Sequence, residues 1–179
     1  KLGGLKFLIK LSNGLRKIGI DLRKKFFGKS VLSNFGGELE MIICGGAALN
    51  PRMIDFFETI GISIYEGFGI TECAPLVAVT PYYARKYGSV GPAVPCCQGR
   101  IDGTGTNAQG FIEGEIQIKG DNVMLGYYKD PARTKSVFTE DGWFRTSDIA
   151  VMDEKGRFLI KGRNNNMILG PSGENIYPE

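Results

Sequence analysis

The stretch from residue 40 to residue 72 constrains the fold more than any other part of this chain. A short apolar run at 40–44 ends at a pair of glycines, which predicts a buried strand that runs into a tight turn. Asn50 is a typical N-cap residue and Pro51 suits the first helical position, while Gly61 is typical of a helix end. We therefore expect a strand, a turn and a well-capped helix in close succession.

A second strand is predicted at 62–65, and a glycine-broken loop follows it directly at 66–72. Between the two strands, Met53, Phe57 and Ile60 fall on one helical face, which predicts the buried side of the helix. Strand, helix, strand and loop in this order favour the α/β class. We expect part of an open, mainly parallel sheet with helices, whose ligands bind beyond the carboxyl ends of the strands.

The two flanking regions follow other patterns. Residues 5–27 repeat apolar and basic side chains at helical spacing, which predicts helical segments interrupted near Gly14 and Gly19. From about Tyr87, short strands alternate with glycine turns, which predicts a small β-rich, barrel-like subdomain. Two dipeptides predict hairpin turns: Asp141-Gly142 and Lys155-Gly156. We expect three regions: an α/β region at 1–84, the β-rich region at 85–162, and a polar, glycine-rich end at 163–179.

Composition excludes some kinds of chemistry. The chain has no histidine, so a histidine-based catalytic triad is impossible, and its four cysteines lack the C-x-x-C spacing of a zinc site. Such cysteines favour a reducing cytoplasm, and Cys96-Cys97 is expected in a turn without special reactivity. The spacing of Gly103, Gly105 and Ala108 imitates a dinucleotide fingerprint, but no buried strand precedes it, so we expect a hairpin loop.

Charge is unevenly distributed along the chain. Residues 1–30 hold nine basic side chains against one acid, a balance of +8, which leaves −5 for the rest of a chain whose net charge is +3. A solvated basic helix face would explain this, and so would peripheral contact with an anionic membrane surface, such as the inner face of the cell membrane. No apolar run reaches the roughly 18 residues that a membrane span needs. Lys1 opens the chain without a Met or a signal-peptide pattern, which indicates an internal fragment.

The segment YEGFGITE, residues 65–72, holds the side chains with the clearest chemical potential. Two glycines let the backbone approach a ligand, and Phe68 between them offers a flat face to a base. Thr71 offers a hydroxyl to a phosphate oxygen, and Glu72 offers a hard oxygen ligand to Mg²⁺. Taken alone, the same pattern also suits a structural turn with a buried aromatic ring.

This segment resembles the signature of the adenylate-forming superfamily, which includes acyl-CoA synthetases, luciferases and adenylation domains of peptide synthetases. Further segments resemble family elements in the same order: Gly45-Gly46-Ala47-Ala48, the stretch GEIQIKGDNVMLGYY at 114–128, WFRTSD at 143–148, and Lys161-Gly162-Arg163. The ending GENIYPE, residues 173–179, is similar to that of bacterial long-chain fatty-acid ligases. The resemblance covers nearly the whole chain. It implies that 1–84 is the C-terminal part of the large α/β adenylation subdomain, that 85–162 is the β-rich subdomain, and that 163–179 is the hinge and the beginning of a mobile C-terminal domain.

The resemblance implies specific roles for residues of this chain. Phe68 would stack on adenine, Thr71 would contact the α-phosphate, Glu72 would bind Mg²⁺, and Asp148 would hold the ribose hydroxyls beside Arg163. Thr71 and Glu72 are thus the implied catalytic residues and Glu72 the implied metal ligand. The implied nucleotide-binding residues are Gly46, Ala47, Ala48, Glu66, Gly67, Phe68, Gly69, Thr71, Asp148 and Arg163. Two positions depart from the family pattern: Ser147 replaces a glycine, and Asn165 replaces an Asp or Lys at the hinge.

The implied reaction of the parent protein joins a fatty acid to CoA, with ATP and Mg²⁺, through an acyl-AMP intermediate. The resemblance places the phosphate loop before Lys1 and the catalytic lysine after Glu179, so the isolated chain is expected to be inactive. ATP, fatty acid and CoA are the expected partners, and no nucleic acid is expected. Two alternatives stay open: an adenylation domain that loads a carrier protein or an amino acid, and a non-catalytic module that binds nucleotide or a membrane surface.

Overall fold

The structure is a computed structural model that describes residues 2–27, 31–47, 49–83, 85–107, 109–164, 168–169 and 175–176. The chain divides into two compact units. The first comprises Lys1–Cys44 and Leu49–Tyr65, and the second comprises Gly45–Ala48 and Glu66–Glu179. In the part of the chain that the structure describes, no helix is both long and apolar enough to cross a membrane.

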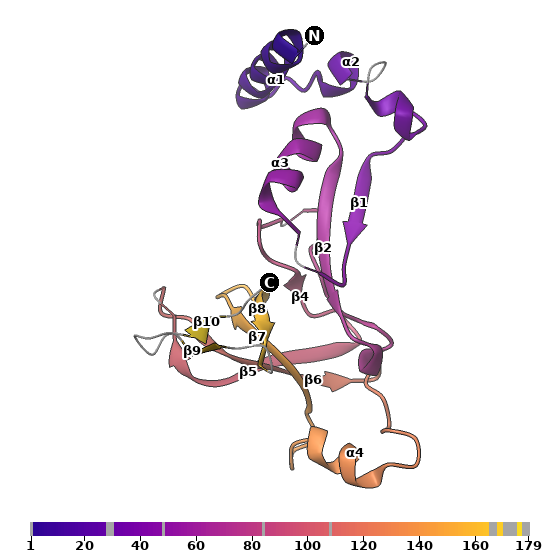
Figure 1. Ribbon diagram of the computed structural model, residues 1–179, viewed down its shortest axis with the longest axis vertical. Coiled ribbons are helices and arrows are strands. Elements are labelled where there is room, and N and C mark those ends of the chain that lie inside the picture. Colours follow the sequence, from indigo (N-terminus) through magenta and orange to yellow (C-terminus); the bar gives the residue numbers. More distant parts are fainter. Residues whose placement is uncertain are drawn as a thin grey trace. The chain divides into compact units, whose positions relative to one another are not determined.

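The first unit places helices beside a pair of strands. Its elements are α1 (Leu2–Lys17), α2 (Arg23–Phe27), the 3-10 helix η1 (Leu32–Phe35), β1 (Met41–Cys44), α3 (Pro51–Ile60) and the first part of β2 (Ser63–Gly69). In Figure 1, β1 and the start of β2 lie side by side and run in the same direction, with α3 as the connection between them. The Ser63 amide donates to the Glu40 carbonyl at 2.9 Å, so the expected strand-helix-strand unit is confirmed.

Helix α3 begins and ends where the sequence predicts. The Asn50 side chain accepts a hydrogen bond from the Arg52 amide at 2.9 Å, and Gly61 ends the helix in the left-handed conformation, at φ 99°. The predicted buried face is partly wrong, because Met53 is 51% exposed. Ile60 is buried as predicted and Phe57 packs against the core, while Ile54 takes the buried place that the pattern gave to Met53.

The N-terminal segment is helical, but its interruptions differ from the prediction. Helix α1 continues through Gly14 to Lys17, so the expected break at Gly14 is wrong. An interior glycine weakens a helix by only about 1 kcal/mol relative to alanine, which the rest of α1 tolerates. The break near Gly19 is confirmed, because Gly19 has φ 83° and lies between α1 and α2. The core of this unit consists of Phe27, Leu32, Ile54, Ile60, Ile62 and Ile64.

The second unit begins with an antiparallel pair. Residues Glu66–Gly69 continue β2 and pair with β3 (Leu76–Val79), with Phe68 opposite Ala78. The predicted loop at 66–72 is therefore wrong over its first half. The 3-10 helix η2 (Thr71–Cys73) forms the connection between the two strands. The sheet β1-β2-β3 thus combines a parallel pair with an antiparallel one.

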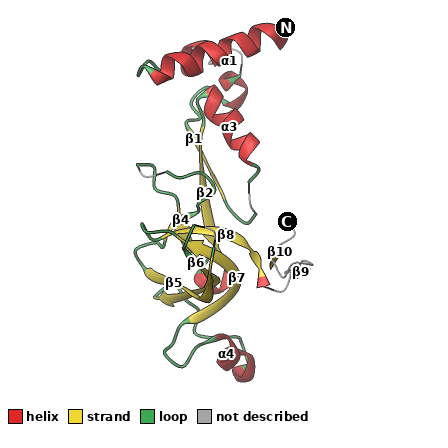
Figure 2. Ribbon diagram, turned by 90° about the vertical axis from the view of Figure 1, so that its left-hand side faces the viewer, coloured by secondary structure: helices red, strands yellow, loops and turns green. Residues whose placement is uncertain are grey.

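A five-stranded antiparallel sheet forms most of the second unit, which confirms the β-rich region. Its order is β4-β8-β7-β6-β5, with bounds β4 (Gly91–Pro92), β5 (Cys97–Thr106), β6 (Ile112–Gly120), β7 (Phe144–Met152) and β8 (Arg157–Arg163). Figure 2 shows these strands as strongly curved ribbons, with α4 (Pro131–Val137) beyond the sheet. Among the described residues β4 and β5 form the two edges, so the sheet is open rather than a closed barrel. Strands β9 (Ile168–Leu169) and β10 (Asn175–Ile176) form a separate pair.

Turns in this unit follow the glycine pattern in most places. Gly156 adopts φ 70° between β7 and β8, and Gly142 adopts φ 80° before β7, as the two dipeptides predict. Gly103 and Gly105 lie inside β5, and the hairpin connection follows at 107–111. The expected hairpin loop is therefore wrong for Gly103 and Gly105, which belong to the strand before the connection. Ala108, the last residue of the apparent dinucleotide fingerprint, lies outside the described residues.

The core of the second unit is separate from that of the first. Its buried apolar residues are Cys73, Val77, Ala78, Cys97, Ile116, Ile118, Phe144, Ala150 and Phe158. Burial, with the nearby Cys97 and Glu72 groups, raises the pKa of the Cys73 thiol to about 12, so Cys73 is an inert thiol at neutral pH. Cys96 is exposed and Cys97 is buried, and all four cysteines are free.

Candidate functional site

The connection between β2 and β3 presents Thr71 and Glu72 at the end of a strand pair. The Ile70 amide donates to the Pro75 carbonyl at 2.8 Å, which closes the connection into a compact turn. A Cβ atom on Gly69 would lie 2.4 Å from the same Pro75 oxygen, which is closer than atoms can pack. Gly69 is therefore required by the close approach of its own chain, a reason that differs from the predicted approach of a ligand. Thr71 is exposed and Glu72 is half-buried.

The turn after β1 lies next to this strand pair. A Cβ atom on Gly45 would be 3.2 Å from the Gly67 carbonyl oxygen, so the turn and β2 are in close proximity. Gly46 has φ 87°, which a residue with a side chain rarely adopts, and Ala47 is exposed. The structure thus brings Gly46 and Ala47 to the strand that carries Gly67. Ala48 lies outside the described residues.

Phe68 has a structural contact as well as an implied ligand role. It is half-buried and packs against the core of the second unit. Such packing restricts the rotamers of the ring, and a restricted aromatic side chain loses less entropy when a ligand stacks on its free face. The partial burial of Phe68 is therefore compatible with both interpretations that the sequence left open, stacking on a base and a structural turn with a buried aromatic ring.

Glu72 is held by a segment more than fifty residues further along the chain. The Tyr127 hydroxyl donates to Glu72 Oε1 at 2.9 Å, and the Met124 amide donates to the Glu72 carbonyl at 2.8 Å. Asn122 Nδ2 also donates to the carbonyls of Cys73 and Leu76, at 3.2 and 2.8 Å. Within the described part of the chain, Glu72 Oε2 accepts no protein hydrogen bond. One carboxylate oxygen is thus fixed and the other is available.

Asp148 lies on β7 opposite Arg163 on β8, so the two implied ribose-site residues are neighbours. Arg163 Nε donates to Asp148 Oδ1 at 3.1 Å, while Asp148 Oδ2 is buried and has no partner among the described residues. Only 5% of Asp148 is exposed. Burial raises the pKa of the Asp148 carboxyl; Arg163 opposes the rise, and the negative charges of Glu72 and Glu115 add to it. The Glu72 and Asp148 carboxylates therefore lie within electrostatic range of each other.

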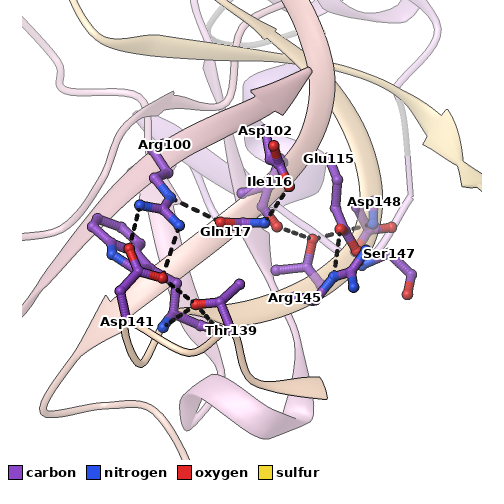
Figure 3. Close-up of polar contacts among 12 residues, drawn as sticks. Arg100, Asp102, Glu115, Ile116, Gln117, Thr139, Asp141, Arg145, Ser147 and Asp148 are labelled. Carbon is purple, nitrogen blue, oxygen red and sulfur yellow. Dashed lines mark hydrogen bonds and ion pairs between the residues drawn. The ribbon is translucent and has the colours of Figure 1, made fainter. Parts of the chain in front are cut away.

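A second carboxylate, Glu115, fixes the backbone that leads to Asp148. Its Oε1 accepts the Ser147 amide at 2.9 Å, and its Oε2 accepts Arg145 Nε at 3.0 Å. Figure 3 shows the Glu115 carboxylate directed at both groups, next to Asp148. Ser147 has φ 63°, in the left-handed region, which costs about 1 kcal/mol for a residue with a side chain. The glycine that the resemblance implies at this position would avoid that cost.

The hydroxyl of Thr146 adds a further restraint. It donates to the Ile116 carbonyl at 2.9 Å and accepts the Asp148 amide at 3.1 Å. Sequence patterns gave no role to Thr146, Glu115 or Tyr127, although all three lie inside the segments that resemble family elements. A polar side chain that alternates with buried strand residues was the available signal for Glu115.

The described residues also bear on metal binding. Nowhere in the described ranges do three or more Cys, Asp or Glu side chains gather closely enough to form a protein-only metal cluster. Mg²⁺ commonly uses only one or two carboxylates, together with phosphates and water. A single carboxylate with a free oxygen, as at Glu72, suits that mode of Mg²⁺ binding. It does not suit a structural zinc site, which needs four protein ligands.

Comparisons with known proteins agree with this geometry. The sequence profile of the family described as AMP-binding enzyme matches residues 9–128. The chain therefore belongs to the family of AMP-binding enzymes, in the acyl-CoA ligase branch of the adenylate-forming superfamily.

Among curated proteins, the chain is 41% identical over 143 residues to a long-chain-fatty-acid–CoA ligase of Yersinia pestis, a match that covers 78% of this chain and 25% of that protein. It is 33% identical over 165 residues to the peroxisomal acyl-CoA ligase 891 of Penicillium roqueforti, covering 88% of this chain and 23% of that protein. The chain thus spans about a quarter of the length of these relatives.

Solved structures give the same fold. ATP-bound MatB from Rhodopseudomonas palustris matches with a TM-score of 0.70 and 30% identity, over 82% of this chain and 29% of that one. The O-succinylbenzoate–CoA synthetase MenE of Bacillus subtilis, in complex with ATP and magnesium, matches with a TM-score of 0.68 and 26% identity, over 82% of this chain and 32% of that one. Both neighbours are adenylate-forming enzymes, and the match to them supports the predicted α/β fold class.

Proposed function

We propose that these residues form one wall of the nucleotide site of an ATP-dependent acyl-CoA synthetase that acts on long-chain fatty acids. A fatty-acid carboxylate attacks the α-phosphorus of ATP, which gives acyl-AMP and pyrophosphate, and the CoA thiol then displaces AMP. The curated relatives include several long-chain-fatty-acid–CoA ligases, which favours this acyl class. Such an enzyme would act in fatty-acid metabolism in the cytoplasm.

The observation that carries the proposal is the unpartnered Oδ2 of Asp148. A buried oxygen without a donor costs roughly 1 to 3 kcal/mol, so a ligand hydroxyl that donates to Oδ2 would recover that free energy on binding. Two adjacent ribose hydroxyls suit the two oxygens of one carboxylate, with Arg163 already bound to Oδ1. Asp148 is accordingly the ribose ligand of the proposed site.

The other side chains take roles that fit their places. Phe68 stacks on adenine and Thr71 donates to the α-phosphate, while Glu72 would hold Mg²⁺ through Oε2. When bound, Mg²⁺ neutralises charge on the phosphates. The remaining nucleotide contacts come from two adjoining backbone segments: Gly46 and Ala47 in the turn, and Glu66, Gly67 and Gly69 in the strand. Ala48, which lies outside the described residues, is assigned to the same group from the sequence alone.

The direct test is an assay of the full-length protein that contains these residues. With ATP, Mg²⁺ and CoA, we expect pyrophosphate release when long-chain fatty acids are added. Amino acids offered in place of the fatty acid should give no release above background. A carrier protein offered in place of CoA should not sustain release beyond the first turnover, because pyrophosphate leaves when acyl-AMP forms and a thiol is needed to displace AMP. Release with an amino acid and none with any fatty acid would replace this proposal with the adenylation-domain alternative.

A peripheral contact with an anionic membrane is a second property that one observation favours. Helix α1 carries exposed Lys6, Lys10 and Phe7, and Ile18, directly after the helix, is also strongly exposed. Basic side chains next to exposed apolar ones suit the surface of an anionic membrane. We expect the full-length protein to sediment with phosphatidylserine vesicles at low salt and to be released at high salt, because basic residues near the surface are screened. Replacing Phe7 and Ile18 with Ser should weaken sedimentation at low salt. Equal sedimentation with neutral vesicles would contradict an electrostatic contact.

A further inference from the structure

The carboxylate of Glu72 has one protein partner among the described residues, the hydroxyl of Tyr127, at 2.9 Å from Oε1. Tyr127 lies in the segment after β6 and has no part in the implied site. The hydrogen bond leaves Oε2 open and fixes the direction in which that oxygen points. A hydrogen bond to a charged acceptor is stronger than one between neutral groups, so this contact restrains the carboxylate effectively.

Tyr127 is itself held from several sides. Its amide donates to Thr134 Oγ1 at 2.9 Å, and that hydroxyl donates to the Asp130 carbonyl at 2.8 Å. Asp130 is the N-cap of α4, where its side chain accepts the Arg133 amide at 2.9 Å. The Arg133 guanidinium lies 4.4 Å from the centre of the Tyr127 ring. The phenol is therefore anchored by the first turn of α4.

The loop that carries Glu72 does not need this hydroxyl for its attachment. Three other hydrogen bonds already join the two segments, from the Met124 amide and the Asn122 side chain to backbone carbonyls. The Tyr127 bond differs from these because it ends on the side chain. Its specific effect is on the orientation of the carboxylate rather than on the course of the backbone.

From this arrangement we infer that Tyr127 is a positioning residue, whose hydroxyl orients the Glu72 carboxylate for the Mg²⁺ that accompanies ATP. This inference rests on the proposed function of Glu72 as the metal ligand. Partners that hydrogen-bond a metal-binding side chain typically contribute about 10- to 100-fold to metal affinity. The Tyr127 ring packs against Arg133 and stabilises the loop, whereas the Tyr127 hydroxyl orients the Glu72 carboxylate.

The experiment compares ATP binding with and without metal in the full-length protein, measured by titration calorimetry without a fatty acid. Tyr127→Phe removes one oxygen and retains the ring. We expect about ten-fold weaker binding of ATP in the presence of Mg²⁺ and unchanged binding in EDTA. Tyr128→Phe is the matched control, since Tyr128 is 87% exposed, and it should alter neither affinity. In a Glu72→Gln background, Tyr127→Phe should have no further effect.

Equal weakening in Mg²⁺ and in EDTA would show that the hydroxyl only supports the loop, and no weakening in either would also overturn the inference. The proposed function is tested separately by the wild-type protein. If Mg²⁺ does not strengthen its ATP binding, the metal role of Glu72 fails. If Mg²⁺ strengthens binding in wild type and equally in Tyr127→Phe, only the positioning role fails.

Discussion

Replacing Glu72 with Gln is expected to lower fatty-acid-dependent pyrophosphate release by the full-length protein by at least about 100-fold. Gln retains the size of the side chain and an oxygen that can accept the Tyr127 hydroxyl, so the loop keeps its hydrogen bond. The substitution removes the negative charge that holds Mg²⁺ on the phosphates. Removing one electrostatic group from a site that develops charge typically costs 100- to 1,000-fold in turnover. Turnover is measured by coupled detection of pyrophosphate.

The matched control is Glu140→Gln, which makes the same change on an exposed turn of the same unit. It should leave turnover and thermal stability as in wild type. Calorimetry with ATP in EDTA should give the same affinity for wild type and Glu72→Gln, because the metal is then absent. Undiminished turnover in Glu72→Gln would exclude the carboxylate as the metal ligand.

Replacing Asp148 with Asn is expected to weaken AMP binding by about 100-fold. Each hydrogen bond from a ribose hydroxyl to the charged carboxylate contributes roughly 1.5 kcal/mol, and two such bonds correspond to about two factors of ten. The loss should be specific for the ribose. Wild type should prefer AMP over its 2′,3′-dideoxy analogue by a similar factor, and the variant should bind both ligands equally, as measured by titration calorimetry.

This preference should also depend on pH. Hydroxyl groups donate to the ionised carboxylate, so the preference for AMP over the dideoxy analogue is full above the pKa of Asp148 and declines as pH falls through it. Burial, together with the charges of Glu72 and Glu115, raises that pKa despite the opposing Arg163, so the decline begins at a higher pH than for an ordinary aspartate. The ratio of the two affinities removes the titration of the phosphate, which both ligands share. A ratio that does not change with pH would contradict the assignment.

Asp153 provides a contrasting buried carboxylate in the same sheet region. Burial disfavours its charge, but hydrogen bonds from Arg157 and Lys86 outweigh that effect and hold the pKa of Asp153 well below its usual range. Asp153→Asn should therefore lower stability by about 3 kcal/mol and leave AMP affinity unchanged. The stability that Asp153 contributes is present at neutral pH and is lost as pH falls through its lowered pKa. A loss of AMP affinity in this variant would show that the assay reports unfolding instead of the site.

Local sequence signals predicted the elements whose ends depend on neighbouring residues. Asn50, Pro51 and Gly61 set the bounds of α3 because caps act within one helical turn. The same kind of signal, Asp130 followed by Pro131, marks the start of α4, a helix that the sequence interpretation missed. The turns at Gly142 and Gly156 were predictable because each needs a positive φ.

Long-range pairing explains what the sequence did not show. Residues 66–69 look like a glycine-broken loop, yet they form a strand because β3 supplies hydrogen-bond partners. Side-chain placement in a pair of this kind depends on residues beyond any local window. Gly69 illustrates the difference, since the close approach of the Pro75 carbonyl excludes a side chain there, and no local signal indicates that approach.

The site divides in the same way. Residues of contiguous motifs, such as Phe68 and Glu72, were identified from the sequence because their order resembles a family pattern, and the roles assigned to them stay predictions. Tyr127 and Glu115 escaped notice because they act on residues about 30 to 55 positions away in the chain, a separation that the hydrogen bonds of the folded structure bridge. Only coordinates show such contacts, since no spacing rule relates their ends.

The backbone at Ser147 limits which mutations this part of the protein can accept. With φ at 63°, the position excludes β-branched side chains such as Val and Ile through clashes with their own peptide groups, whatever occupies the site. Gly, Asn and Asp remain compatible, as does Ser at a small cost. If variants tolerate few residue types at position 147, the cause is the left-handed backbone conformation of that residue. The restriction would not be evidence that the side chain contacts the nucleotide.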